Sequence, residues 1–103
     1  MIFRRRFADV VRTQLDLFER DHAGLIADCD AAERAYDSAP REEAEERYGD
    51  YLDLVDTGME LLAELRDAYA ATLDEDTAEK YEAAFNRAVA RRFARFAPGL
   101  DAC

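Results

Sequence analysis

The sequence contains 103 residues, of which half are apolar and 37% are charged, and its formal net charge is −10. This length and apolar content suffice for one folded domain and argue against a disordered chain. An acidic chain is a poor partner for nucleic acid, whose binding depends on neutralising phosphates, and no apolar run reaches the roughly 18 residues of a transmembrane helix.

The spacing of the apolar residues predicts an all-α fold. Apolar side chains recur at alternating steps of three and four along most of the sequence, which is the periodicity of a helix with one continuous buried face. Four Gly, two Pro and the near absence of β-branched runs argue against a sheet. We therefore expect residues 1–103 to form a single helical domain.

The first predicted helix spans about residues 3–36. Its apolar face is formed by Ala8, Val11, Leu15, Phe18, His22, Leu25, Cys29, Ala32 and Tyr36. Gly24 interrupts this helix at a cost of about 1 kcal/mol relative to Ala. A close backbone approach or a local bend at Gly24 would explain why that cost is tolerated.

The second predicted helix spans about residues 41–73. It follows the sequence Asp37-Ser38-Ala39-Pro40, in which Ser38 or Asp37 can cap the new helix and Pro40 suits its first turn. So short a connection makes the first two helices antiparallel neighbours. The apolar face of this helix is formed by Ala44, Tyr48, Tyr51, Val55, Gly58, Leu62, Leu65, Tyr69 and Thr72, with Leu52 and Met59 on one flank.

The third predicted helix spans about residues 77–97. Asp76 and Glu79 resemble a capping box at its start, and Pro98-Gly99 is expected to end it. Its apolar face includes Ala78, Tyr81, Ala84, Phe85, Ala88, Val89 and Phe96. At about 1.5 Å of rise per residue, this helix is too short to cover the whole hairpin formed by the other two.

The predicted architecture is therefore a long antiparallel hairpin plus a shorter helix, a three-helix bundle with coiled-coil-like packing that oligomerisation completes. A second copy of the chain, in a homodimer, is the simplest cover for the apolar face left over. The expected function is a non-catalytic interaction or scaffold module, with a different protein partner also open. The expected interface residues are Tyr51, Val55, Met59, Leu62 and Leu65.

A metal site is the first alternative function. Glu19 and His22 form a Glu-x-x-His pair, the spacing that places a carboxylate and an imidazole one turn apart in carboxylate-bridged di-iron bundles. One pair per chain would become two in a symmetric dimer, which could then bind iron or another divalent metal. The possible further ligands on the second helix are Asp56, Glu60 and Glu64. The competing interpretation is a tolerated polar histidine beside a solvated carboxylate.

The basic ends of the chain suggest a second alternative. Residues 1–12 carry four Arg and one Asp, and residues 87–103 carry the same numbers, whereas the acidic residues lie mainly between them. Arg4, Arg5 and Arg6, with Phe7 beside them, could bind an anionic membrane surface or an acidic partner as a peripheral adaptor. The simpler interpretation is that these arginines pair with carboxylates of the same bundle.

The remaining signals point to a protein without a catalytic site. The sequence has no glycine-rich phosphate loop, no nucleophile motif and no spaced set of Cys or His ligands, so no cofactor is predicted. Asp9, Arg12 and Asp16 interrupt any apolar core of a signal peptide. The two cysteines, Cys29 and Cys103, are too few for a disulfide framework, which favours the cytoplasm, although a bridge through Cys103 stays open.

Overall fold

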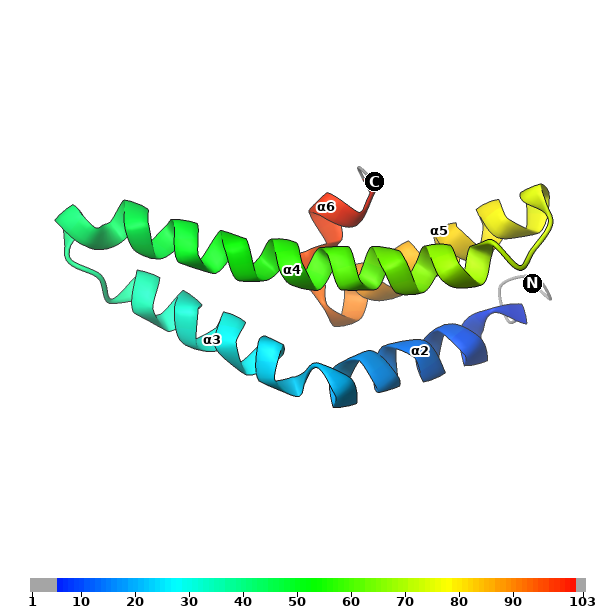
Figure 1. The fold of residues 1–103 in the computed structure, drawn as a ribbon, viewed down its shortest axis with the longest axis horizontal. Coiled ribbons are helices and arrows are strands. Elements are labelled where there is room, and N and C mark those ends of the chain that lie inside the picture. The colour runs from blue at the N-terminus through cyan, green and yellow to red at the C-terminus, as the bar shows by residue number, and fades with distance from the viewer. Residues whose placement is uncertain (1–5, 102–103) are drawn as a thin grey trace.

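The computed structural model describes residues 6–101 and confirms the all-α prediction. This part of the chain forms five α-helices and two short 3-10 helices, with no strand among the described residues. The molecule is elongated, with principal extents of 51 × 24 × 22 Å. The long helix α4 (Ala44–Ala70) runs along its full length, and α2 and α3 return antiparallel to it as an arc (Figure 1).

The first predicted helix is in fact two helices, α2 (Ala8–Asp21) and α3 (Ala23–Asp37). The bend lies at His22, whose backbone has φ −122° and ψ 29°, and not at Gly24, where a Cβ would meet nothing within 4 Å. The His22 N–H donates to the Phe18 carbonyl, so the bend closes α2 without leaving that donor unpaired. It directs α3 along α4 and turns α2 toward α5 (Figure 1).

The hairpin turn differs in detail from the prediction. Ser38 does not cap the second long helix, because its hydroxyl and its N–H both donate to the Arg34 carbonyl and thereby close α3. Pro40 follows in an extended conformation, and a 3-10 helix, η1 (Arg41–Glu43), leads into α4. The helix α4 ends at Ala70, three residues earlier than expected, with Asp67 and Tyr69 carbonyls accepting the closing hydrogen bonds.

Helix α5 (Glu75–Arg92) begins two residues before the predicted start. Its N-cap is Asp74 and not Asp76: one Asp74 carboxylate oxygen accepts from the Thr77 N–H at 3.0 Å and the other from the Thr77 hydroxyl at 2.8 Å. The backbone hydrogen bond from Thr77 holds the pKa of Asp74 below its ordinary value. A carboxylate at this position also meets the positive end of the helix.

The chain does not stop being helical at Pro98-Gly99. After Phe93, the 3-10 helix η2 (Ala94–Phe96) leads into the short helix α6 (Ala97–Asp101), whose first turn accommodates Pro98. Phe96 and Leu100 are almost fully buried, so this segment is part of the core. In Figure 1 it packs against the middle of α4.

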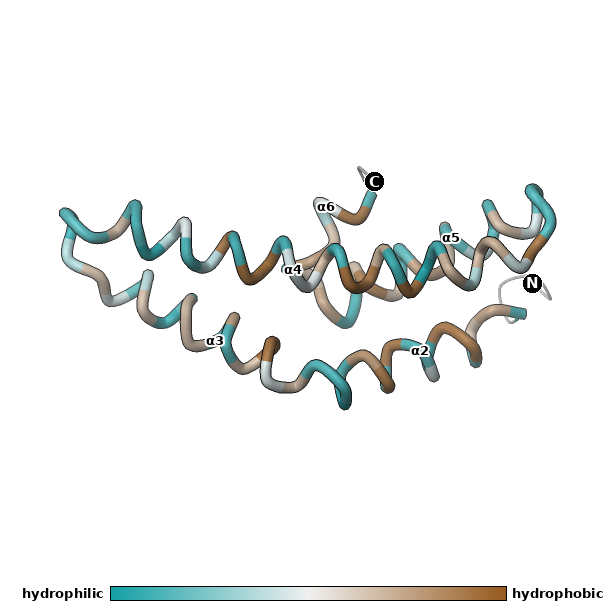
Figure 2. The backbone as a smooth tube through the Cα atoms, viewed as in Figure 1, coloured by the Kyte–Doolittle hydropathy of each residue, from teal (hydrophilic) through white to brown (hydrophobic). Residues whose placement is uncertain are grey.

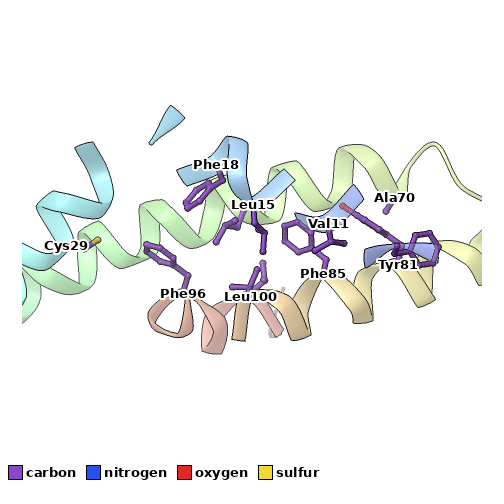
Figure 3. Packing of buried hydrophobic residues seen from close by; sticks show 12 residues of the cluster. Val11, Leu15, Phe18, Cys29, Ala70, Tyr81, Phe85, Phe96 and Leu100 are labelled. Carbon is purple, nitrogen blue, oxygen red and sulfur yellow. The ribbon is translucent and has the colours of Figure 1, made fainter. Parts of the chain in front are cut away.

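Three helices enclose the core at one end of the molecule. Helix α5 packs against both α2 and α4, and η2 and α6 close the middle. The buried side chains come from all of these elements, as Figure 3 shows. They include Phe7, Val11, Leu15, Phe18, Leu62, Tyr81, Phe85, Val89, Phe96 and Leu100. The other end consists of α3 and the first half of α4 alone (Figure 1).

Candidate functional site

We call residues 23–56, which comprise α3, the turn and the first part of α4, the two-helix arm. Cys29 is the single fully buried residue of α3, and no residue of α4 before Gly58 is fully buried. Three large side chains of the arm stay exposed: Tyr36 at 39%, Tyr48 at 45% and Leu52 at 38%. The Tyr36 and Tyr48 rings lie 5.1 Å apart across the two helices. The arm therefore presents three large, partly apolar side chains to solvent.

The exposed residues of α4 continue the face that is buried farther along the same helix. Tyr48, Leu52, Val55 and Met59 lead into Leu62 at steps of four and three, so all of them point to one side of α4. From about Met59 onward that side is covered by α5, η2 and α6. Before Met59 α4 packs mainly against α3, with Tyr36 beside Tyr48, and Figure 2 shows the apolar colouring of α4 from about its middle onward.

Some of the predicted interface residues lie before the part of α4 that α5, η2 and α6 cover, and others lie within it. Leu62 is 0% exposed and lies in the core of a single chain, so it needs no second chain to cover it. Met59 lies beside Gly99 of α6, and Leu65 packs against the same core. Tyr51 and Val55 are half-buried within the arm. The exposed large apolar side chains of α4 are Tyr48 and Leu52, nearer its start, and whether the predicted set forms an interface stays a prediction.

A groove of about 690 Å³ runs between α2 and α5. Phe7, Val11 and Leu15 form its apolar floor, and small alanines of both helices line its walls. Four guanidinium groups surround it, namely those of Arg12, Arg87, Arg91 and Arg92. We call this feature the arginine groove. In a chain with a net charge of −10, so many cations around one apolar surface form a distinct local chemistry.

The four arginines of the arginine groove differ in their ion-pair partners. Arg92 binds Asp16 at 2.7 Å and Glu19 at 2.8 Å, which ties α5 to α2. Arg12 binds Asp9 on its own helix at 2.6 Å. Among residues 6–101, Arg87 and Arg91 form no ion pair. Two of the four cations in the arginine groove are therefore not neutralised by the described chain.

Arg95 fastens the base of the two-helix arm. Its guanidinium binds Asp30 at 2.8 Å and Glu33 at 3.2 Å, both on α3, and lies 5.7 Å from the centre of the Tyr51 ring on α4. These contacts join η2 to both helices of the arm. Arg95 therefore acts as a cross-link between elements.

The Glu19 and His22 pair is split by the end of α2. Glu19 lies on the last turn and accepts from Arg92, while His22 forms the bend and its ring lies 5.2 Å from that of Phe18. Asp56, Glu60 and Glu64 are exposed on α4. Residues 6–101 of one chain contain no cluster of three or more His, Cys, Asp or Glu that could bind a metal ion. A site built from two chains stays a prediction.

Of the predicted basic patch, the structure describes only Arg6. Arg4 and Arg5 lie outside the described residues, and so does Cys103, so the structure does not address the patch as a whole or a Cys103 disulfide. Arg6 is exposed, with its guanidinium 5.6 Å from the centre of the Phe7 ring. No helix within residues 6–101 is both long and apolar enough to cross a membrane.

Cys29 is a free thiol that is fully buried, at 0% exposure, within the core cluster. Burial raises the pKa of this thiol, and the nearby Arg95 charge opposes that effect only in part. A thiol that is neutral and shielded from solvent is a poor nucleophile. The prediction that Cys29 is a small packing residue therefore agrees with its environment.

Two buried polar side chains, Gln14 and Arg66, were not predicted from the sequence. Gln14 lies on α2 between core residues, and its side-chain oxygen accepts from the Tyr81 hydroxyl at 2.9 Å. Arg66 lies on α4 at 4% exposure, four residues after Leu62 and four before Ala70. Its position in line with the buried Leu62 and Ala70 could have indicated that Arg66 is buried. However, an arginine is ordinarily expected to be exposed to solvent.

Burial of Tyr81 predicts a loss of stability at high pH. Burial raises the pKa of this phenol to about 12 from its ordinary 10.0, although the hydrogen bond to Gln14 opposes the shift. Between pH 10 and 12 the unfolded chain therefore loses a proton that the folded chain keeps. We expect the free energy of unfolding to be unaffected by this group below pH 10 and to fall by about 1.4 kcal/mol per pH unit above it.

Urea unfolding followed by circular dichroism between pH 8 and pH 11.5 measures this effect. The Tyr81→Phe variant is the control, since it retains the ring and removes the ionisable group. It should cost about 1 kcal/mol at neutral pH, where Gln14 loses its partner, and should have a shallower dependence above pH 10. Equal slopes for the two proteins would show that Tyr81 does not titrate as its burial requires.

The features described above rest on the geometry of this chain alone. No protein-family model matches the sequence, and neither a curated protein nor a solved structure is significantly similar to it.

Proposed function

We propose that this chain is a non-catalytic helical interaction module that acts as a homodimer. The observation that carries the proposal is the two-helix arm, on which Tyr48 and Leu52 of α4 and Tyr36 of α3 are exposed, the two α4 residues on a face that is covered farther along the same helix. A helix face of this kind gains free energy when a further helix covers it. The coiled-coil-like bundle expected from the sequence is, in this proposal, completed by the second chain.

The shape of the chain supports two chains more than a larger assembly. One half of the hairpin has three layers of helix and the other half has two, over a length of 51 Å. Two copies placed antiparallel would bring the thin half of each beside the thick half of the other. Such an arrangement closes after two chains, because the same pair of surfaces is used twice.

The proposal is tested by light scattering coupled to size-exclusion chromatography under reducing conditions. We expect twice the mass of one chain for the wild type. The double variant Tyr48→Lys/Leu52→Lys should be monomeric, with a dissociation constant raised on the order of 100-fold, because two charges would be buried without partners.

Leu17→Lys is the matched control. Leu17 is 41% exposed on α2, as exposed as the arm residues, but it lies outside both the arm and the groove. This variant should remain dimeric. A wild-type chain that is monomeric at the highest concentration reached would contradict the proposal, as would an equal effect of the arm and control substitutions.

A further inference from the structure

The arginine groove offers the chemistry that would receive an acidic, apolar helix. Its floor of Phe7, Val11 and Leu15 is apolar, and alanines on both walls allow another helix to approach closely. Arg87 and Arg91 stand four residues apart, and therefore one helical turn apart, on the α5 side. Neither forms an ion pair within residues 6–101.

The two-helix arm has the complementary composition. Residues 23–56 contain eleven acidic residues and three arginines. On α4, Glu45, Leu52 and Asp56 lie on one side of the helix together with Tyr48, since their spacing returns to that side at each turn. Glu45 and Asp56 are exposed and form no ion pair in the described part of the chain. The exposed apolar side chains of the arm thus lie between carboxylates.

We infer that the arginine groove of each chain binds the two-helix arm of a second copy of the same chain. Tyr48 and Leu52 would then lie over the groove, and Glu45 and Asp56, about 16 Å apart along α4, would flank the Arg87–Arg91 pair, which spans about 6 Å of α5. This inference rests on the proposed homodimer and names the surface that receives the arm. Charge complementarity selects the occupant: the arm is acidic and carries exposed apolar side chains, and the groove is apolar between cations.

In the inferred dimer, each chain binds the arm of the other in its own arginine groove. Each chain has one arm and one arginine groove, at opposite ends of a molecule 51 Å long. Two antiparallel chains can therefore make the same contact twice, and no arm is left without a groove. The contact also neutralises the two arginines that have no partner among the described residues and shields the arm from water.

Charge reversal on each surface separately tests the inference. In the groove variant, Arg87→Glu/Arg91→Glu, two like charges face the acidic arm, and in the arm variant, Glu45→Arg/Asp56→Arg, the new arginines lie near the unpaired Arg87 and Arg91. We expect each variant alone to dimerise about tenfold or more weakly than the wild type. In an equimolar mixture, the groove variant's glutamates receive the arm variant's arginines, while the second contact stays native. At a concentration where each variant alone is mainly monomeric, the mixture should therefore dimerise.

The control variant is Arg20→Glu/Lys80→Glu, which changes the net charge equally at exposed cations outside both the arm and the groove and should dimerise like the wild type. Circular dichroism spectra and melting curves of all variants establish that they are folded. Sedimentation equilibrium at two salt concentrations gives the dissociation constants, and added salt should weaken the wild-type dimer.

Each failure has a distinct meaning. A groove variant that dimerises like the wild type, or a mixture that stays monomeric, overturns the inference and leaves the proposed homodimer standing. A wild-type monomer overturns both. If the groove variant keeps its dimer but loses binding to phosphatidylserine vesicles that the wild type binds, the groove receives an anionic surface instead of the arm, and the inference is also overturned.

Discussion

Replacing Arg66 with alanine is expected to lower the free energy of unfolding by about 3–5 kcal/mol, a large part of the stability of a domain of this size. The guanidinium is buried on α4 and makes three hydrogen bonds: to Asp67 at 2.9 Å, to the Asn86 side chain at 3.1 Å and to the Leu100 carbonyl at 3.1 Å. It therefore joins α4 to α5 and to α6. The substitution leaves the Leu100 carbonyl without this donor in a buried position and removes an aliphatic stem from the core.

Two further variants separate these causes in urea unfolding experiments. Arg66→Met retains most of the volume but no donor, so it should still lose most of the effect. Asp67→Asn weakens only the partner that is 59% exposed and should change stability by about 0.5 kcal/mol or less. If Arg66→Met were as stable as the wild type, the hydrogen bonds would not contribute and the side chain would act by packing alone.

Gly58→Leu is expected to destabilise the chain by about 3–5 kcal/mol. A Cβ at Gly58 would lie 2.7 Å from Cζ and 2.9 Å from Cδ1 of the Phe96 ring, and closer still to its Cε1. Phe96 is 1% exposed, and its ring meets that of Phe18 at 6.0 Å and that of Phe93 at 6.4 Å. The ring cannot move aside cheaply, so a leucine must expel it together with the segment that carries it.

Gly49→Leu is the matched control on the same helix. A Cβ at Gly49 meets nothing within 4 Å, and leucine is the better helix former by about 0.8 kcal/mol. This variant should be slightly more stable than the wild type in the same measurement. Comparable destabilisation by both substitutions would mean that the close approach of Phe96 is not the cause.

Much of the fold could be predicted from apolar spacing alone. The buried face of α2 contains the predicted Val11, Leu15 and Phe18, and that of α5 contains Tyr81, Phe85 and Val89. The ends of helices were less predictable, because several residues near each end can serve as a cap. Asp74 and Asp76 are equally suitable in the sequence, and the register of the loop after α4 decides between them.

The bend at His22 and the helix after Phe93 could not be predicted, since both arise from tertiary packing. His22 lies within an unbroken apolar pattern, and α2 leaves the direction of α3 because α5 must fit beside it. Pro98-Gly99 reads as a stop signal, yet burial of Phe96 and Leu100 favours one further turn of helix. Packing outweighs such local preferences in both cases.

The candidate surfaces were predictable in kind but not in position. The shortness of the third helix correctly indicated that α4 is only partly covered. The position on α4 at which packing against α5 and α6 ends depends on how these helices are placed along α4. The apolar pattern of a single helix does not predict that placement. The arginine groove depends on α2 and α5 becoming neighbours, although Arg12 and Arg91 are far apart in the sequence.

The uneven cover of α4 also has a consequence for local unfolding. Opening the two-helix arm exposes few fully buried side chains, whereas opening the other end disrupts a core to which α2, α4, α5 and α6 all contribute. The free energy of opening therefore rises along α4 from the hairpin turn toward Ala70. A partner that covers the arm would therefore raise the free energy of opening most at the end of the molecule that opens most readily.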